Sequence, residues 1–332
     1  MINEDNIGEA WLISAHENGP SLILNGEHKG KTLDLLYKTN REMYSNIKAE
    51  TFPLLIKMID AYDKLSVQVH PDDEMAKQFN SLGKTECWYI LDAVENAEII
   101  YGHNAMSKDE FKALLQLGKY DQLLNKIPVK KGDFFFKPAG VVHAIGAGIL
   151  ILEIQQSSDI TYRLFDYERI EKDGSKRELH LDLGLNATKF PSVTLSNQFT
   201  LKTVNSNEII TLTENEYFNV YKWNLTTSFK VTNYPFSLIT FIKGAGTING
   251  QNYKLGDSVF VPSTINNIEI IPISVTEVIV AKLHQTLKDM IPNIKITEPK
   301  IDPACAAARL ALYHYNDLCF SFVKNLSQIV EG

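Results

Sequence analysis

The sequence predicts a mainly β protein built from two tandem jelly-roll barrels with helical insertions. A short unit, Lys-x-Gly-Asp-x-x-Phe-x-Pro, occurs at 130–138 and again at 254–262. In each copy Gly-Asp favours a tight turn, the following residues alternate like a strand, and proline ends the strand. Residues 236–250 add two short strands separated by glycine and Asn-Gly turns. Such closely spaced strands fit two jelly rolls better than a βαβ arrangement.

Helix signals interrupt the first half of the chain. Residues 33–45 have a helical pattern, and Asp72 is placed to cap a short helix through Phe79. Ser107 and Glu110 form a capping box before residues 111–117, and another turn of helix is expected at 121–125.

The end of the chain, residues 301–329, also has a helical pattern. Asp302 stands at its cap position and Pro303 at its first helical position. Apolar helical stripes usually pack, so we expect a packing or oligomer element here.

A chain of 332 residues is long enough for two or three domains. We expect four parts. Residues 1–60 supply N-terminal strands and a helix packed on the first barrel, 61–190 the metal-binding barrel with a helical insert at 107–127, 191–285 a second barrel without metal, and 286–332 a C-terminal helical segment.

The composition excludes several classes of partner. With 33 Lys+Arg against 40 Asp+Glu, the net charge of -7 offers no footprint for nucleic acid or an anionic membrane. Three cysteines, an odd number in a long chain, argue against a disulfide framework and favour a reducing compartment. The first residues lack a secretory signal, and no segment approaches the ~20 apolar residues that span a bilayer. We expect a cytoplasmic protein.

Four side chains suggest a metal site. Gln68 and His70 are two positions apart at the end of an apolar run, so in a strand both lie on one face. Glu86 precedes an apolar strand, and His143 follows the first copy of the repeat. One amide, one carboxylate and two imidazoles form a donor set without thiolate, which suits Zn²⁺ first and Fe²⁺, Mn²⁺ or Co²⁺ after it.

The repeat supplies an internal comparison. Gly132 to His143 spans the same eleven positions as Gly256 to Asn267, so Asn267 occupies the place of His143 in the second copy. This substitution predicts a metal centre in the first barrel only. The competing interpretations are structural: His70 as a turn histidine, Glu86 as a surface acid and His143 as a residue at the edge of the core.

A second group of polar residues follows the first barrel. Alternation from Asp159 to Arg163 would place Asp159, Thr161 and Arg163 on one face of a strand. Arg163 is then either a structural ion-pair partner or a cation facing the metal cavity, able to hold an anionic substrate or stabilise charge that develops during a reaction.

Taken together, five segments resemble the type I mannose-6-phosphate isomerases, in particular their short bacterial form. They are Gly-Glu-Ala-Trp-Leu-Ile-Ser-Ala-His at 8–16, Leu-Ser-Val-Gln-Val-His-Pro at 65–71, Gly-Lys-Thr-Glu-Cys-Trp-Tyr at 83–89, Pro-Ala-Gly-Val-Val-His-Ala-Ile at 138–145 and Ser-Asp-Ile-Thr-Tyr-Arg at 158–163. The resemblance implies barrels of the cupin type and an enzyme that interconverts mannose 6-phosphate and fructose 6-phosphate through an enediol. It extends over roughly residues 8 to 285.

The resemblance also implies roles for individual residues. One zinc ion per chain is expected on the four ligands proposed above, with Lys84 and Arg163 as catalytic and substrate-binding residues, Asp159 nearby and Ser66 as a phosphate contact. We expect metal and burial to lower the pKa of Lys84, so that it acts as the base. A metal-bound water and another residue near Glu86 stay open as alternative bases.

Two other functions compete with the isomerase. An iron-dependent cupin oxygenase is one, although a glutamine ligand argues against it. A non-catalytic cupin that binds a sugar phosphate is the other, favoured by the short segment before Gly8. In each case the expected partner is a small molecule, and the protein is a monomer or a homodimer.

Overall fold

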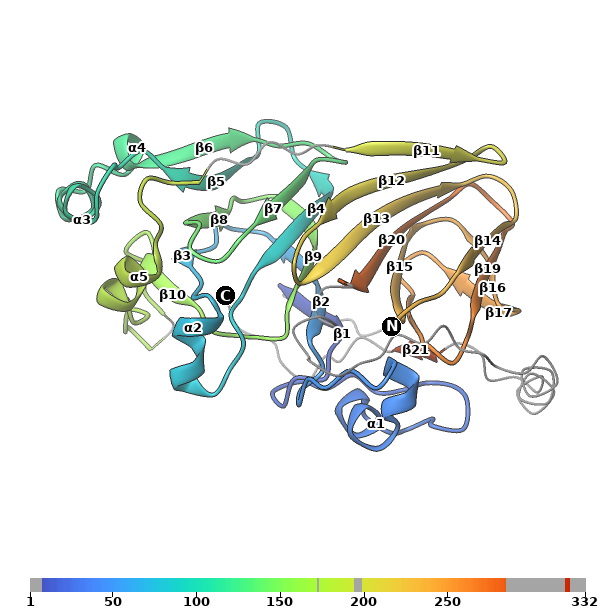
Figure 1. The fold of residues 1–332 in the computed structure, drawn as a ribbon. Helices are drawn as coiled ribbons and strands as arrows, with labels where there is room; N and C mark the ends of the chain where they lie inside the picture. Colours follow the sequence, from blue (N-terminus) through green and yellow to red (C-terminus); the bar gives the residue numbers. More distant parts are fainter. Residues whose placement is uncertain (1–7, 172, 194–198, 285–319, 323–332) are drawn as a thin grey trace. The chain divides into compact units, whose positions relative to one another are not determined.

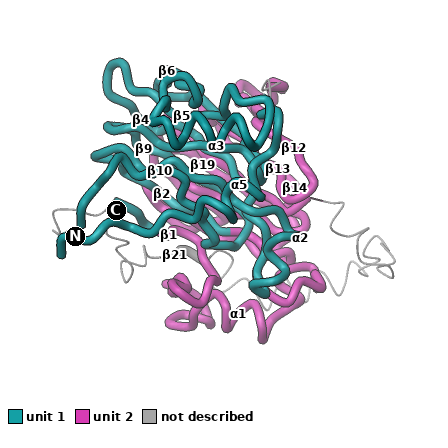
Figure 2. Tube along the Cα trace, turned by 90° about the vertical axis from the view of Figure 1, so that its left-hand side faces the viewer, with its two compact units in different colours: residues 1–10, 55–197, 328–332 teal, residues 11–54, 198–327 magenta. Residues whose placement is uncertain are grey.

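The computed structural model of the protein describes residues 8–171, 173–193, 199–284 and 320–322 (Figure 1). The chain forms two compact units (Figure 2). Unit 1 comprises Met1–Ala10, Leu55–Asn197 and Gln328–Gly332, and unit 2 comprises Trp11–Leu54 and Gln198–Ser327. Two of the boundaries between them fall inside the first two strands, β1 (Glu9–Ile13) and β2 (Leu54–Ala61).

Unit 1 contains two mostly antiparallel sheets of five strands each. Their strand orders are β1-β2-β9-β4-β7 and β10-β3-β8-β5-β6. The remaining strands of these sheets are β3 (Val67–Val69), β4 (Glu86–Ala93), β5 (Glu98–His103), β6 (Leu124–Pro128), β7 (Phe134–Lys137), β8 (His143–Ile145), β9 (Ile149–Gln156) and β10 (Tyr162–Phe165).

The interior of unit 1 is an apolar cluster to which both sheets contribute. Ile90 and Ile151 come from one sheet, and Ile99 and Ile145 come from the other. Trp88 belongs to the same cluster. Burial of these side chains from two facing sheets is the packing of a jelly roll.

Helices cover a second apolar cluster of unit 1. Phe111, Leu123 and Leu185 of three helices pack with Val67 and Val69 of β3. The helical segments of unit 1 are α2 (Asp73–Ala76), η2 (Lys77–Phe79), α3 (Lys108–Gln116), α4 (Tyr120–Leu123) and α5 (Leu181–Ala187). The helices predicted after Asp72 and Ser107 are confirmed, since these side chains accept the expected hydrogen bonds from the backbone N–H groups of Met75 and Glu110. The turn predicted at 121–125 is helical only to Leu123, because β6 begins at Leu124.

Unit 2 has the same kind of construction with a larger sheet. Its strand orders are β11-β12-β13-β20-β15-β18-β21 and β14-β19-β16-β17. Its elements are α1 (Leu33–Thr39), η1 (Arg41–Tyr44), β11 (Thr200–Val204), β12 (Asn207–Glu214), β13 (Phe218–Leu225), β14 (Phe229–Thr232), β15 (Ser237–Lys243), β16 (Ala245–Ile248), β17 (Gln251–Lys254), β18 (Ser258–Val261), β19 (Asn267–Pro272), β20 (Thr276–Leu283) and β21 (Phe320–Phe322). Both sheets again share one core, which includes Ile239 and Ile268. The mainly β fold class is therefore confirmed.

The predicted repeat adopts the same turn twice. Asp133 and Asp257 each accept a hydrogen bond from the backbone N–H three residues earlier, at 2.9 Å in both copies. Gly132 has φ of 93° and Gly256 has φ of 88°, a left-handed conformation that favours glycine. The strand after each turn, β7 or β18, pairs with the corresponding strand, β4 or β15.

Three local predictions need correction. The pattern at 33–45 is α1 followed by the 3-10 helix η1, with a break at Asn40. The strand expected from Asp159 begins only at Tyr162, where pairing with β3 starts. The helix predicted for 301–329 is wrong at Phe320–Phe322, which form β21 on the edge of β18, and its other residues lie outside the described part of the chain.

Edge pairing explains the last difference. Backbone groups at an open sheet edge form hydrogen bonds with any suitably placed extended segment, whatever its helical periodicity.

Among the described helices, none has the length and apolar character needed to cross a membrane.

Candidate metal centre

The end of β3 is attached to the start of β4 by backbone contacts. Lys84 N–H donates to the Pro71 carbonyl at 3.0 Å, and Gly83 N–H donates to the Asp73 carboxylate at 2.7 Å. A Cβ atom on Gly83 would lie 2.6 Å from backbone atoms of Asp72 and Asp73, so this close approach requires glycine. The contacts bring the residues that follow β3 beside those that begin β4.

The start of β8 is attached to β3 in a similar way. Gly140 N–H donates to the His70 carbonyl at 3.0 Å, and Gln68 is paired with His143 across the β3–β8 ladder. Because Val67 and Val69 face the helix-covered cluster, Gln68 between them faces the opposite side. Three segments of sequence therefore meet at one place.

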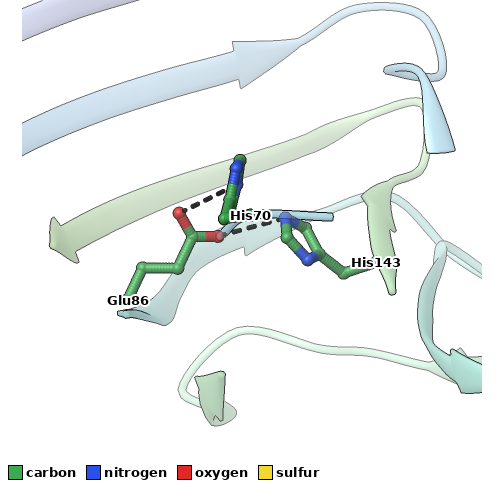
Figure 3. Close-up of side chains that lie close together, drawn as sticks. All are labelled: His70, Glu86 and His143. Atoms are coloured by element: carbon green, nitrogen blue, oxygen red, sulfur yellow. Dashed lines mark ion pairs between the residues drawn. The ribbon is translucent and has the colours of Figure 1, made fainter. Parts of the chain in front are cut away.

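His70, Glu86 and His143 converge there. One ligand atom from each lies within 4.8 Å of the others, and each side chain is about 1% exposed. His70 Nε2 lies 3.5 Å from Glu86 Oε2, and His143 Nε2 lies 3.3 Å from Glu86 Oε1. Figure 3 shows both imidazoles next to the carboxylate. The described part of the chain contains this one group of histidine, cysteine or acidic side chains with metal-binding geometry.

The histidine tautomers suit metal binding. His70 Nδ1 lies 2.9 Å from the Ile160 carbonyl, and His143 Nδ1 lies 2.8 Å from the Val141 carbonyl. A carbonyl only accepts, so each Nδ1 carries the proton and each Nε2 presents a lone pair. Burial and the nearby lysines lower the pKa of His70 well below its usual value, and burial lowers the pKa of His143 to about 3. Both rings are neutral near pH 7, as metal ligands must be.

Two candidate ligand atoms make no hydrogen bond within the described part of the chain, although charged groups lie near them. His70 Nε2 and Glu86 Oε2 are buried and have no hydrogen-bond partner among the described residues. Such groups are costly to bury unless something satisfies them, and a cation between them would. Gln68 Nε2 lies 3.5 Å from His143 Nε2, and a half-turn of the amide would present its oxygen instead. The donor set of the described residues thus fits a divalent metal.

Two lysines surround Glu86. Lys84 Nζ lies 3.4 Å from Glu86 Oε2, and Lys137 forms an ion pair with Glu86 Oε1. Burial alone raises the pKa of the Glu86 carboxyl, but Lys137 and Lys84 outweigh it and hold that pKa well below its usual range. Glu86 is therefore ionised and able to act as a ligand.

Opposing effects of the chain itself act on the pKa of Lys84. Burial lowers it, but the carboxylates of Glu86, Glu153 and Glu9 act in the opposite direction, and the Lys84 pKa is raised overall. Local sequence does not show that Glu153 and Glu9 lie near Lys84, because the fold brings them there. Among the charges of the chain itself, Lys84 is an ammonium group and a proton donor.

Sequence reasoning missed several buried charged residues of unit 1, among them Lys57, Lys137 and Glu153. Lys137 Nζ lies 2.9 Å from the centre of the Trp88 ring, Trp88 Nε1 donates to Glu153 Oε2 at 2.7 Å, and Lys57 Nζ lies 3.0 Å from Glu9 Oε1. Each of the three, Lys57, Lys137 and Glu153, is the lone charged residue inside an apolar strand segment. That pattern could have identified them, since a buried charge requires a partner.

The predicted substrate residues differ in how they lie relative to the candidate metal ligands. Arg163 is paired with Gln68 across β10–β3, which puts the two side chains on one face of the sheet, and its Nη1 donates to the Glu178 carbonyl at 2.9 Å. Asp159 is exposed and precedes β10. Ser66 is buried just before β3, and no contact among the described residues joins it to the histidine group.

The second barrel has lost the donor set. Asn267 stands at the position of His143, as predicted, at the start of β19. Equivalent pairing after the repeated turn places Ser237 opposite Val261 where the first barrel has Glu86 opposite Lys137. The first barrel thus has a carboxylate and an ammonium group where the second barrel has the hydroxyl of Ser237 and the isopropyl group of Val261.

A jelly-roll barrel with a buried His-Glu-His group defines a cupin with a metal-capable centre. Residues 1–103 match the family described as phosphomannose isomerase type I, catalytic domain. Residues 208–280 match the mannose-6-phosphate isomerase cupin domain. The chain belongs to the type I mannose-6-phosphate isomerase family, and the family predicted from the five sequence segments is confirmed.

Individual relatives agree with this membership. A mannose-6-phosphate isomerase of Streptococcus mutans is 45% identical over 272 residues, covering 80% of this chain and 86% of the relative. One of Bacillus subtilis is 44% identical over 268 residues, covering 79% and 85%. The crystal structure of the mannose 6-phosphate isomerase from Bacillus subtilis superposes with a TM-score of 0.82 at 39% identity, covering 85% of this chain and 91% of that one.

Proposed function

We propose that the protein interconverts mannose 6-phosphate and fructose 6-phosphate at this centre, with one zinc ion held by Gln68, His70, Glu86 and His143. The observation that carries the proposal is the convergence of two unprotonated Nε2 atoms and one ionised carboxylate inside the first barrel. Family membership and the names of the relatives support the substrate pair.

The donor set suits the chemistry of an aldose–ketose isomerase. The reaction moves a proton between C1 and C2 through an enediol, while the oxygen atoms on these carbons gain negative charge. A bound zinc ion supplies a Lewis acid for that charge. Two neutral histidines, a neutral glutamine and a single carboxylate leave the centre with a net positive charge, whereas additional acidic ligands would remove it.

Lys84 is assigned to the reacting end of the sugar. Its side chain is 5% exposed and lies at the same carboxylate as the two histidines. Because the surrounding carboxylates raise the Lys84 pKa, its ammonium group is suited to donate a hydrogen bond or a proton to a sugar oxygen. The role expected from sequence, in which Lys84 is the base, requires a bound metal to lower this pKa.

Arg163 is assigned to the anionic groups of the substrate. It shares a sheet face with Gln68, and its Nε is buried without a hydrogen-bond partner among the described residues. An unpartnered guanidinium donor beside a metal-capable centre is suited to a phosphate or an enediolate oxygen. Asp159, which precedes β10, and Ser66, which precedes β3, are proposed as further substrate contacts.

Product identification tests the proposal. Zinc-loaded protein incubated with mannose 6-phosphate in D₂O should give fructose 6-phosphate by NMR, with deuterium at C2 of recovered mannose 6-phosphate if proton transfer proceeds through an enediol. The His143→Ala variant should give neither signal. Binding of mannose 6-phosphate without turnover would instead favour a sugar-phosphate-binding cupin.

A parallel measurement addresses the oxygenase alternative. The iron-loaded protein is incubated with the same sugar in an oxygen electrode cell. The proposal expects no substrate-dependent O₂ uptake. Uptake that depends on His143, together with absence of fructose 6-phosphate, would contradict it.

A further inference from the structure

We propose that Lys137 is a positioning residue for Glu86, which confines the metal-binding role of this carboxylate to Oε2 and weakens the affinity of the centre for divalent cations. The inference rests on the proposed metal site. It concerns a residue that neither the local sequence pattern nor the donor set requires.

Lys137 and Glu86 are direct cross-strand partners. They face each other in the β4–β7 pairing, and the Lys137 ammonium forms an ion pair with Glu86 Oε1. The same ammonium lies 2.9 Å from the centre of the Trp88 ring. Lys137 is 1% exposed, so its side chain is enclosed and its charge cannot reach water as that of a surface lysine does.

The two oxygens of Glu86 are therefore in different environments. Oε1 accepts a hydrogen bond from the Lys137 ammonium and lies 3.3 Å from His143 Nε2. Oε2 is buried without a hydrogen bond among the described residues and lies 3.5 Å from His70 Nε2 and 3.4 Å from the Lys84 ammonium. A carboxylate with both oxygens free can bind a metal through both of them. Lys137 is hydrogen-bonded to Oε1, whereas Lys84 lies near Oε2 without a hydrogen bond, so we assign Oε2 to the metal.

The charge of Lys137 acts against the metal. An ammonium group and a divalent cation that share one carboxylate lie close together, and their repulsion is weakly screened in an interior that excludes water. Removal of the ammonium is expected to strengthen divalent metal binding by about tenfold or more. It also leaves the Glu86 charge less compensated when no metal is bound.

The second barrel shows that the strand does not itself require lysine. At the corresponding position β18 carries Val261, and its partner on β15 is Ser237 rather than an acid. The turns before both strands have the same hydrogen bonds and glycine conformation. The turn and the strand therefore form without a lysine at this position, and the lysine is present in the barrel whose partner residue is the acid Glu86.

A purely structural role makes a different prediction. If Lys137 only neutralises a buried carboxylate, its loss should lower the free energy of unfolding without changing how a bound metal is coordinated. The positioning role predicts changes in both metal affinity and coordination geometry. Metal binding, rather than enzyme activity, distinguishes the two.

The experiment compares Lys137→Met, Lys137→Gln and Lys137→Arg with the unmodified full-length protein. Zinc dissociation constants are measured by chelator competition, and the coordination geometry is measured from the visible absorption of the Co²⁺-loaded protein. Lys222→Met is the matched control, because Lys222 also pairs with an acid, Glu277 at 2.8 Å, on neighbouring strands of unit 2.

Lys137→Met and Lys137→Gln should bind zinc about tenfold more tightly or better, with an altered Co²⁺ spectrum. Lys137→Arg, which keeps the charge, and Lys222→Met should match the unmodified protein. Lys137→Gln retains a hydrogen-bond donor and serves if Lys137→Met does not fold. Unchanged or weaker zinc binding in the folded neutral variants would overturn the proposal, as would absence of metal binding by the unmodified protein.

The outcome is separable from that of the proposed function. If the unmodified protein binds zinc and fails to isomerise mannose 6-phosphate, the isomerase proposal is lost, while tighter binding in Lys137→Gln still supports the positioning role. If isomerisation is found and the neutral variants bind zinc as before, the positioning role alone is wrong.

Discussion

Gln68 and His143 face each other across the β3–β8 strand pair, with their Nε2 atoms 3.5 Å apart. Seventy-five positions separate them in the chain. Their pairing joins the first candidate ligand to the last, because His70 follows two residues after Gln68 and Glu86 lies between the two imidazoles. This strand pair therefore brings three of the four candidate ligands together, and the β3–β4 contacts bring Glu86.

His143→Ala should abolish stable metal binding. The change removes one of two imidazole donors, and loss of a direct ligand should exceed the 10- to 100-fold decrease that is typical when only a supporting hydrogen bond is lost. Zinc content after dialysis checks this. Asn267→Ala, at the same position in the second copy, is the control and should leave both zinc content and isomerase activity unchanged.

Gln68→Glu should separate metal affinity from turnover. A second carboxylate at the centre attracts the cation more strongly but removes the net positive charge that stabilises an enediolate. We expect a lower zinc dissociation constant together with a kcat decreased by about tenfold or more. Chelator competition and steady-state kinetics measure the two quantities, and a variant with unchanged kcat would argue against Gln68 as a ligand.

Gly83→Ala should destabilise unit 1. A Cβ atom at this position meets backbone atoms of Asp72 and Asp73 at 2.6 Å, so the β3–β4 connection must shift. We expect a loss of about 1–3 kcal/mol in the free energy of unfolding, measured by urea denaturation, and weaker zinc binding. Gly8→Ala is the control, since its nearest neighbour would be the Asp60 carbonyl oxygen at 3.9 Å.

His103 should make stability depend on pH. Burial lowers the His103 pKa and outweighs the opposing hydrogen bond to the Lys189 carbonyl at 3.1 Å. The ring also contacts Phe111 and Phe190. The unfolded chain binds a proton at His103 more readily than the folded protein does. The contribution of neutral His103 to the free energy of unfolding is therefore complete above the unfolded pKa of about 6.5, and it decreases as the pH falls below that value.

His103→Gln isolates this contribution, since glutamine keeps a donor for the Lys189 carbonyl and does not titrate. Urea denaturation between pH 8 and pH 5, roughly 1.5 pH units on either side of the unfolded value, compares the two proteins. The stability of the unmodified protein should decrease relative to the variant at the acid end. Parallel curves over the whole range would show that His103 is not the titrating group.

Much of the fold follows from local sequence. The repeated Gly-Asp turn at Gly132 and Gly256, and the helix caps at Asp72 and Ser107, all form as predicted. Each is determined within about four residues, by glycine conformation or by a side chain that reaches a nearby backbone N–H. Local patterns do not fix where a strand begins, because pairing with a neighbouring strand sets that position. Asp159, for example, precedes the strand that was expected to contain it.

The amino-acid sequence by itself determined the kinds of donor available for a metal, their place at strand ends, and the loss of the histidine in the second copy. Tertiary structure alone decided that Lys137 lies on one oxygen of Glu86 and that Glu153 and Glu9 raise the pKa of Lys84. The reason is physical. Turns and caps depend on neighbours in sequence, whereas the field at a buried charge depends on which distant strands are paired beside it.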